Sequence, residues 1–285
     1  MALDKCEKVK RRSKRLNFLE KGEHEVPLQP TSPHRKPRVK RVVAPMSPKK
    51  ETVVDSKGSL SRKVEGSLRG AFQHVIGVDE AGRGPLAGPV VAAACWVADG
   101  VEFDGIMDSK KMTQESVREE VYARLVAHPE VRFAVSIQDH TVIDDINILQ
   151  ATMRAMRLAT EDLLKKGGHA IVAHESIALV DGNRAPENMP TAEARFVIKG
   201  DASVFSIAAA SVVAKVTRDR LMHALDKEFP QYGFSQHKGY GTAMHMQALH
   251  THGPCPVHRL TYAPVRKSFE QHANAIASAP PSAKD

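Results

Sequence analysis

Residues 76–90 read IGVDEAGRGPLAGPV, and this stretch decides the fold. A short apolar run precedes two adjacent carboxylates, Asp79 and Glu80, and the turn Gly82-Arg83-Gly84 follows them. Carboxylates at the end of a strand are common ligands of Mg²⁺, which prefers oxygen atoms. An arginine between two glycines suits a backbone that must come close to a ligand. The pattern indicates a metal-dependent enzyme that acts on a phosphate-rich substrate.

A continuous apolar segment follows this turn. Residues 88–97 (GPVVAAACWV) predict a buried strand, and residues 74–78 predict an earlier strand that ends at Asp79. The short connection between them predicts a hairpin. The later pattern predicts strands at 131–137, within 170–180 and at 195–198, and helices at 115–127 (capped by Thr113), 145–166, 203–229 and 242–250. Strands that come first and helices that come later favour an α/β or α+β fold with a helical C-terminal part.

Positive charge is concentrated at the N-terminus. Residues 1–70 hold 19 Lys and Arg against 8 Asp and Glu, whereas the whole chain of 285 residues has a net charge of only +8. The same 70 residues contain six prolines and little periodic apolar pattern, so we expect a disordered basic extension that favours polyanions. We expect the folded domain over residues 71–268, with its helical part at about 220–268, and a disordered tail over residues 269–285.

The cysteine pattern and the hydropathy bear on the compartment. The three cysteines are far apart in the chain, which favours a reduced intracellular protein. No apolar run approaches ~18 residues, so we expect no membrane span. The basic cluster at residues 10–15 suits either a nuclear address or a solvated arm, while Asp4 and Glu7 weaken a mitochondrial interpretation.

Four acidic residues follow strand-like segments: Asp79, Glu80, Asp181 and Asp201. Converging strands would bring these carboxylates together, and close carboxylates repel one another unless cations neutralise them. Two Mg²⁺ ions would relieve that repulsion and suit the hydrolysis of a phosphodiester. The alternative is that each acid is a solvated turn former or a helix cap. Four acids beside one Gly-Arg-Gly turn favour the metal site.

The glycine-rich turn has two weaker interpretations. A dinucleotide-binding fingerprint is one, but its glycine spacing differs, and Pro85 stands where a helix should open. A plain hairpin turn is the other, and it explains the glycines but not Arg83.

Seven blocks of sequence, in one order, carry a resemblance to a known family. They are residues 78–85 (VDEAGRGP), 108–111 (DSKK), 179–183 (LVDGN), 199–202 (KGDA), 209–219 (AASVVAKVTRD), 237–242 (HKGYGT) and 253–259 (GPCPVHR). From about residue 74 to 268 the chain resembles ribonuclease HII, the type 2 ribonuclease H family, and the HKGYGT block fits the bacterial form. The basic N-terminal extension looks like an addition to that form.

The resemblance implies a ribonuclease H-like fold, with a mixed central sheet flanked by helices and a helical C-terminal portion. It implies an endonuclease that hydrolyses the RNA strand of RNA/DNA hybrids and incises 5′ to a ribonucleotide embedded in duplex DNA. The implied cofactor is Mg²⁺ or Mn²⁺, held by the four acids named above. Asp219 is the competitor of Asp201 for the fourth metal-binding position. The rise of a helix would put Asp219 about 27 Å along the helix from Asp201. We expect Asp219 to be a structural partner of Arg218 or Lys215.

The resemblance also implies the residues that bind substrate. The backbone of Gly82, Arg83 and Gly84 would contact the 2′-hydroxyl, the one group that separates RNA from DNA at a single sugar. Tyr240 would stack on the deoxyribose 3′ of the ribonucleotide. Further expectations are that Lys110 and Lys111 contact phosphates, that His237, His258 and Arg259 serve either substrate or structure, and that the protein is a cytoplasmic monomer.

Two alternatives stay open from the sequence. One is a catalytically silent protein that binds hybrids, against which the intact acids argue. The other is the sister enzyme ribonuclease HIII, which carries an added N-terminal domain and a glutamate where this chain has Asp201.

Overall fold

The computed structural model describes residues 60–101, 103, 105–106, 112 and 114–277. Its centre is one sheet of five strands in the order β3-β2-β1-β4-β5. The strands are β1 (His74–Ala81), β2 (Val90–Val97), β3 (Val131–Gln138), β4 (Ser176–Asp181) and β5 (Glu193–Val197). β1, β2 and β3 pair antiparallel, whereas β4 and β5 run parallel to β1. The mixed sheet and the β1–β2 hairpin expected from the sequence are confirmed.

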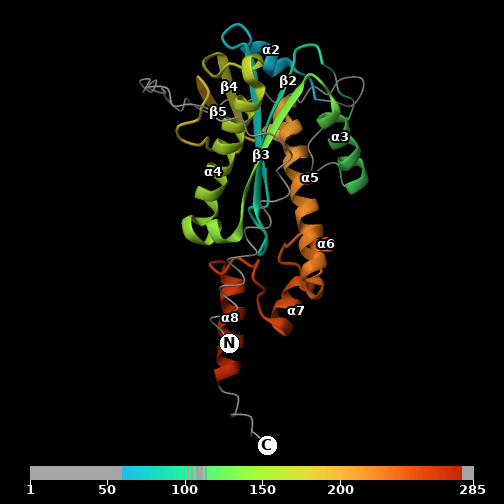
Figure 1. The fold of residues 1–285 in the computed structure, drawn as a ribbon, viewed down its shortest axis with the longest axis vertical. Coiled ribbons are helices and arrows are strands. Elements are labelled where there is room, and N and C mark those ends of the chain that lie inside the picture. The colour runs from blue at the N-terminus through green and yellow to red at the C-terminus, as the bar shows by residue number, and fades with distance from the viewer. Residues whose placement is uncertain (1–59, 102, 104, 107–111, 113, 278–285) are drawn as a thin grey trace, which may run out of the picture. The chain divides into compact units, whose positions relative to one another are not determined.

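Two long helices cover the sheet, one on each face (Figure 1). α4 (His140–Gly167) packs on one face, and α5 (Phe205–Glu228) packs on the other. Successive side chains of a strand point to opposite faces, so in β2 Ala92 and Ala94 meet α4 while Ala93 and Cys95 meet α5. The described part of the chain also contains the α-helices α2 (Lys63–Leu68), α3 (Glu115–Ala127), α6 (Phe234–His237), α7 (Ala243–His252) and α8 (Ala263–Ala277).

β1 is longer than the sequence suggested. Its parallel pairing with β4 ends at Val78↔Val180, but its antiparallel pairing with β2 continues to Ala81↔Val91. Asp79 therefore lies within a strand rather than after one. It lies one residue beyond Val78, the last residue of β1 that pairs with β4. At Asp79, β1 pairs with β2 alone.

The boundaries of the folded part also differ from expectation. Leu60 is buried in the core and α2 is helical, so order begins before residue 71. α8 extends through Ala277, so residues 269–277 are helical and not part of a disordered tail. Val265 and Ser268 of α8 are buried, and the Ser268 hydroxyl donates to the carbonyl oxygen of Leu249 at 2.8 Å. Residues 1–59 and 278–285 of the expected extension and tail lie outside the described residues.

The start of α3 at Glu115 agrees with the helix expected over residues 115–127, whereas α4 starts before the expected residue 145. The expected cap Thr113 lies outside the described residues, and α3 follows Gln114, whose side chain makes no capping hydrogen bond. α4 begins at His140, because the carboxylate of Asp139 accepts from the N–H groups of Thr141 and Val142 at 3.0 Å each. Non-helical backbone at Asn147 interrupts α4. Among the described residues, no helix is both long and apolar enough to cross a membrane.

Candidate metal centre

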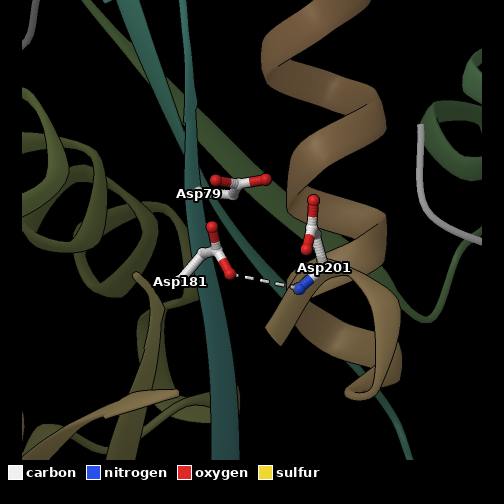
Figure 2. Close-up of side chains that lie close together, drawn as sticks. All are labelled: Asp79, Asp181 and Asp201. Atoms are coloured by element: carbon white, nitrogen blue, oxygen red, sulfur yellow. Dashed lines mark hydrogen bonds between the residues drawn. The ribbon is translucent and has the colours of Figure 1, made fainter. Parts of the chain in front are cut away.

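Three aspartates from separate parts of the chain meet at one place (Figure 2). Asp79 comes from the middle of β1, Asp181 ends β4, and Asp201 lies in the short 3₁₀ turn Gly200–Ala202 before α5. One carboxylate oxygen from each lies within 4.8 Å of the others. Asp79 and Asp201 are buried, and Asp181 is half-buried. The convergence of these three predicted acids is confirmed.

A glycine in β1 lets α5 come close enough to complete this cluster. A Cβ on Gly77 would lie 2.0 Å from the backbone carbonyl carbon of Ser206, in the first turn of α5. Only a residue without a side chain fits there. The first turn of α5 therefore lies directly against β1, and the turn that precedes it brings Asp201 to Asp79.

Backbone hydrogen bonds fix Asp181 against the same turn. Its Oδ1 accepts from the N–H of Gly200 at 2.7 Å and from the N–H of Asp201 at 3.3 Å. Figure 2 shows the second of these bonds. A Cβ on Gly200 would lie 2.5 Å from Cδ1 of Ile207, so a side chain there would require Ile207 to shift. The end of β4 and the start of α5 are thereby held together as one unit.

The cluster is electrostatically costly without a cation. Burial, and then the charges of Glu80 and Asp181, raise the pKa of Asp79 well above that of an ordinary aspartate. Hydrogen bonds from the Glu80 N–H, at 2.7 Å, and from the Ser211 hydroxyl act in the opposite direction. Converging carboxylate oxygens are the donor set that Mg²⁺ and Mn²⁺ prefer. The residues present therefore fit a divalent ion of that kind.

Glu80 is not one of the three residues that converge. Side chains alternate along β1, so Asp79 faces α5 with Gly77, while Glu80 starts toward the face that α4 covers. Its Oε1 lies 3.5 Å from a guanidinium nitrogen of Arg83. Glu80 stays close enough for its charge to act on Asp79. Its expected role as a fourth metal ligand stays a prediction.

The Gly-Arg-Gly turn lies beside Tyr240. Gly82 has a φ of +99°, and a Cβ there would lie 2.0 Å from Nε of Arg218, so glycine is required on both counts. A Cβ on Gly84 would lie 3.4 Å from a ring carbon of Tyr240. Arg83, Gly84 and Tyr240 are all exposed. The expected lysine contacts, Lys110 and Lys111, lie outside the described residues.

Asp219 has the structural role that we expected. It is buried, and its two carboxylate oxygens accept from Nζ of Lys215 at 2.5 and 2.7 Å. Arg118 of α3 approaches the same carboxylate at 3.4 Å. Asp219 thus joins α5 to α3, and it is not part of the aspartate cluster. Of the two expected partners, Lys215 forms the ion pair.

His237, His258 and Arg259, left open by the sequence, are all buried. His258 shares a hydrogen bond with His245, their Nε2 atoms 2.9 Å apart, and Nδ1 of His245 lies 3.0 Å from the carbonyl oxygen of Tyr240. The sequence analysis did not single out His245. No local pattern could have paired these histidines, because residues 243–252 form a separate helix from the loop that holds His258.

A mixed sheet with an aspartate cluster on the α5 face of its central strands suits a metal-dependent hydrolase. The family model described as Ribonuclease HII matches residues 76–270. This is therefore a metal-dependent endoribonuclease with a ribonuclease H-like fold. The chain belongs to the ribonuclease HII family, whose members act on RNA/DNA hybrids.

Three comparisons describe the similarity. Ribonuclease HII of Xanthomonas oryzae pv. oryzae is 51% identical over 197 residues, which cover 69% of this chain and 74% of that protein. The crystal structure of ribonuclease H2 from Pyrococcus horikoshii OT3 is similar in fold, with a TM-score of 0.55 at 24% identity, covering 70% of this chain and 99% of that one. The crystal structure of Bst-RNase HIII in complex with Mn²⁺ has a TM-score of 0.51 at 17% identity, covering 72% and 70%.

Proposed function

We propose that this ribonuclease incises duplex DNA on the 5′ side of a single embedded ribonucleotide, besides cutting the RNA strand of hybrids, and leaves 3′-hydroxyl and 5′-phosphate ends. One observation supports the proposal above all. Asp79, one of three aspartates within 4.8 Å of one another, lies three residues before the Gly82-Arg83-Gly84 turn, whose Arg83 and Gly84 are exposed next to Tyr240. A cutting site and a site that reads the sugar are therefore neighbours.

We propose that Asp79, Asp181 and Asp201, with Glu80 beside them, hold two Mg²⁺ or Mn²⁺ ions. Ions held by these residues would supply the Lewis acidity that lowers the pKa of an attacking water and offsets the negative charge that develops on the leaving 3′ oxygen. The Mn²⁺ in the Bst-RNase HIII complex supports an ion of this type. Backbone N–H groups hold the carboxylates of Asp79 and Asp181, so these ligands need little reorganisation when they bind.

Selectivity rests on the turn and on the tyrosine. The 2′-hydroxyl is the one difference between a ribonucleotide and its DNA neighbours, so a group that touches it must come from a backbone that approaches closely. The Gly82-Arg83-Gly84 turn, exposed at Arg83 and Gly84, supplies such a backbone. The exposed ring of Tyr240 stacks on the deoxyribose that follows the ribonucleotide, and so recognises the junction.

The proposed phosphate contacts, oligomeric state and compartment are supported by the sequence and by the relatives. Lys110 and Lys111 contact phosphates, and the basic residues 1–59 add affinity for nucleic acid that falls with salt. The chain acts as a monomer. The bacterial relative favours the cytoplasm and gives no support to a nucleus or a mitochondrion.

The test is incision of a labelled DNA duplex that carries one ribonucleotide, with Mg²⁺ and an all-DNA duplex as the control. We expect one cut, 5′ to the ribonucleotide, and none in the control. Asp79→Asn should abolish the cut. Equal cutting of both duplexes would refute the proposed selectivity.

Tyr240→Ala separates junction recognition from general hybrid cleavage. We expect cutting at the single ribonucleotide to fall about tenfold more than cutting of a long RNA/DNA hybrid, because stacking on one base or sugar contributes ~1–3 kcal/mol. Tyr122→Ala, on α3, is the matched control and should reduce neither reaction selectively. Equal losses on both substrates would count against the role given to Tyr240.

A further inference from the structure

Two buried arginines face the backbone of residues 82–89. Arg218 comes from α5 and Arg259 from the loop between α7 and α8, and their exposed fractions are 1% and 0%. Within the described part of the chain, their guanidinium groups hydrogen-bond to six backbone carbonyl oxygens and to one tyrosine hydroxyl. These partners are Gly82, Arg83, Ala87, Gly88, Pro89, Lys238 and Tyr262. Buried charge of this kind is costly unless it is hydrogen-bonded, so the turn and the arginines hold each other in place.

Arg259 fixes the orientation of two successive peptide groups. Its Nη2 donates to the carbonyl oxygen of Gly82 at 2.6 Å, and its Nη1 donates to that of Arg83 at 2.9 Å. No described peptide bond is cis. In a trans peptide the carbonyl of one residue and the N–H of the next point in opposite directions. The N–H groups of Arg83 and Gly84 therefore point away from Arg259, and neither donates to another described group.

Tyr262 supports the same carbonyl from a second direction. Its hydroxyl donates to the Arg83 oxygen at 2.8 Å and accepts from Nη1 of Arg259 at 3.0 Å. Its ring also lies against the guanidinium, 5.2 Å from centroid to carbon. The segment that carries both residues is anchored, because the carboxylate of Asp144 accepts from the N–H of Leu260 at 2.9 Å and from that of Thr261 at 3.0 Å.

We propose that Arg259 and Tyr262 are positioning residues that present the N–H groups of Arg83 and Gly84 as a fixed pair of donors to the 2′-oxygen of the ribonucleotide. This inference rests on the proposed function and names the residues that set its selectivity. Neither side chain touches the substrate. Both act through the carbonyl oxygens behind the turn.

The experiment compares binding to two duplexes that differ in one 2′-hydroxyl. Fluorescence anisotropy with Ca²⁺ in place of Mg²⁺ measures affinity, and a gel verifies that the duplex is intact. Tyr262→Phe removes only the hydroxyl, and Arg259→Lys keeps the charge but loses the fork of donors. Tyr122→Phe is the matched control, because Tyr122 also lies under an arginine, Arg220, at 4.5 Å.

We expect the ratio of affinities, ribonucleotide duplex over all-DNA duplex, to fall several-fold in Tyr262→Phe and about tenfold in Arg259→Lys. Affinity for the all-DNA duplex should stay within about twofold, and Tyr122→Phe should keep the wild-type ratio. An unchanged ratio in folded Tyr262→Phe would overturn the inference, and so would equal weakening on both duplexes. If Arg259→Lys does not fold, the affinity ratio of Tyr262→Phe alone decides whether the inference holds. A wild-type protein that fails to distinguish the duplexes would instead refute the proposed function, and the inference with it.

Discussion

The carboxylate of Glu65 in α2 accepts a hydrogen bond, 2.8 Å long, from the backbone N–H of Ser206 in the first turn of α5. The first N–H groups of a helix lack partners within the helix, and a negative charge is favoured there. Glu65 is buried, although residue 65 lies before the segment that the family model matches. A helix outside the family core thus stabilises the start of the helix that follows Asp201.

Glu65→Ala should lower the free energy of unfolding by about 1–3 kcal/mol, because it leaves a buried N–H without an acceptor. Urea unfolding followed by circular dichroism measures the change. Glu187→Ala, an exposed glutamate, is the control and should stay within about 0.5 kcal/mol of wild type. Equal stability of the two variants would contradict the capping role.

Two truncations test whether α2, which carries Glu65, stabilises the fold. Deleting residues 1–59 leaves α2 in place, whereas deleting residues 1–70 removes α2 with Glu65 and Arg62. Arg62 donates to the carbonyl oxygens of Val97 at 2.8 Å and Ala98 at 2.6 Å. We expect the longer deletion to have the lower melting temperature, by several degrees. Identical melting curves for the two deletions would show that α2 contributes nothing to the fold.

Gly77→Ala should separate α5 from β1. The new Cβ would meet the backbone of Ser206 at 2.0 Å, so the helix must move, at a cost of about 1–3 kcal/mol or more. The movement should also weaken Mn²⁺ binding, because Asp201 moves with the helix start. Gly66→Ala is the matched control: it lies within α2 with nothing within 4 Å, and alanine there should stabilise slightly. Wild-type stability in Gly77→Ala would rule out the close approach described above.

Acid should destabilise the protein through two buried histidines. Burial, with the neighbouring histidine adding to it, lowers the pKa of His258 to about 3, and burial lowers that of His245 to about 4. Both values lie below that of an unfolded histidine, so this stability is complete above pH ~6.5 and is lost as the pH falls toward the folded pKa values. The free energy of unfolding should therefore fall below pH ~6.5, by up to about 1.4 kcal/mol per pH unit for each histidine.

His258→Gln should make that pH dependence shallower, since one of the two groups no longer titrates. His250→Gln, an exposed histidine on α7, should keep the wild-type slope. Urea midpoints between pH 7 and pH 5 compare the three proteins. A wild-type slope in His258→Gln would show that His258 is not held neutral.

The features that could be predicted from the sequence are those that follow from the local residue pattern and the order of the strands. The hairpin of β1 and β2 follows from an apolar run on each side of a glycine-rich turn, and Asp79, Asp181 and Asp201 stand where the strands converge. The sequence could not show that Glu80 starts toward the other face, because that depends on β1 continuing past Asp79. It also could not show the roles of Glu65, His245 or Arg259, since each acts on a partner that only the tertiary fold brings near.

The most direct test of the account is a titration of Mn²⁺ into the protein by calorimetry. The account predicts that Asp79→Asn, Asp181→Asn and Asp201→Asn each weaken binding by about tenfold or more, because each removes a ligand from one cluster. Asp162→Asn, an exposed residue of α4 paired with Lys165, should bind as the wild type does. Wild-type affinity in any folded variant of the three cluster aspartates would contradict the claim that they hold the ion together.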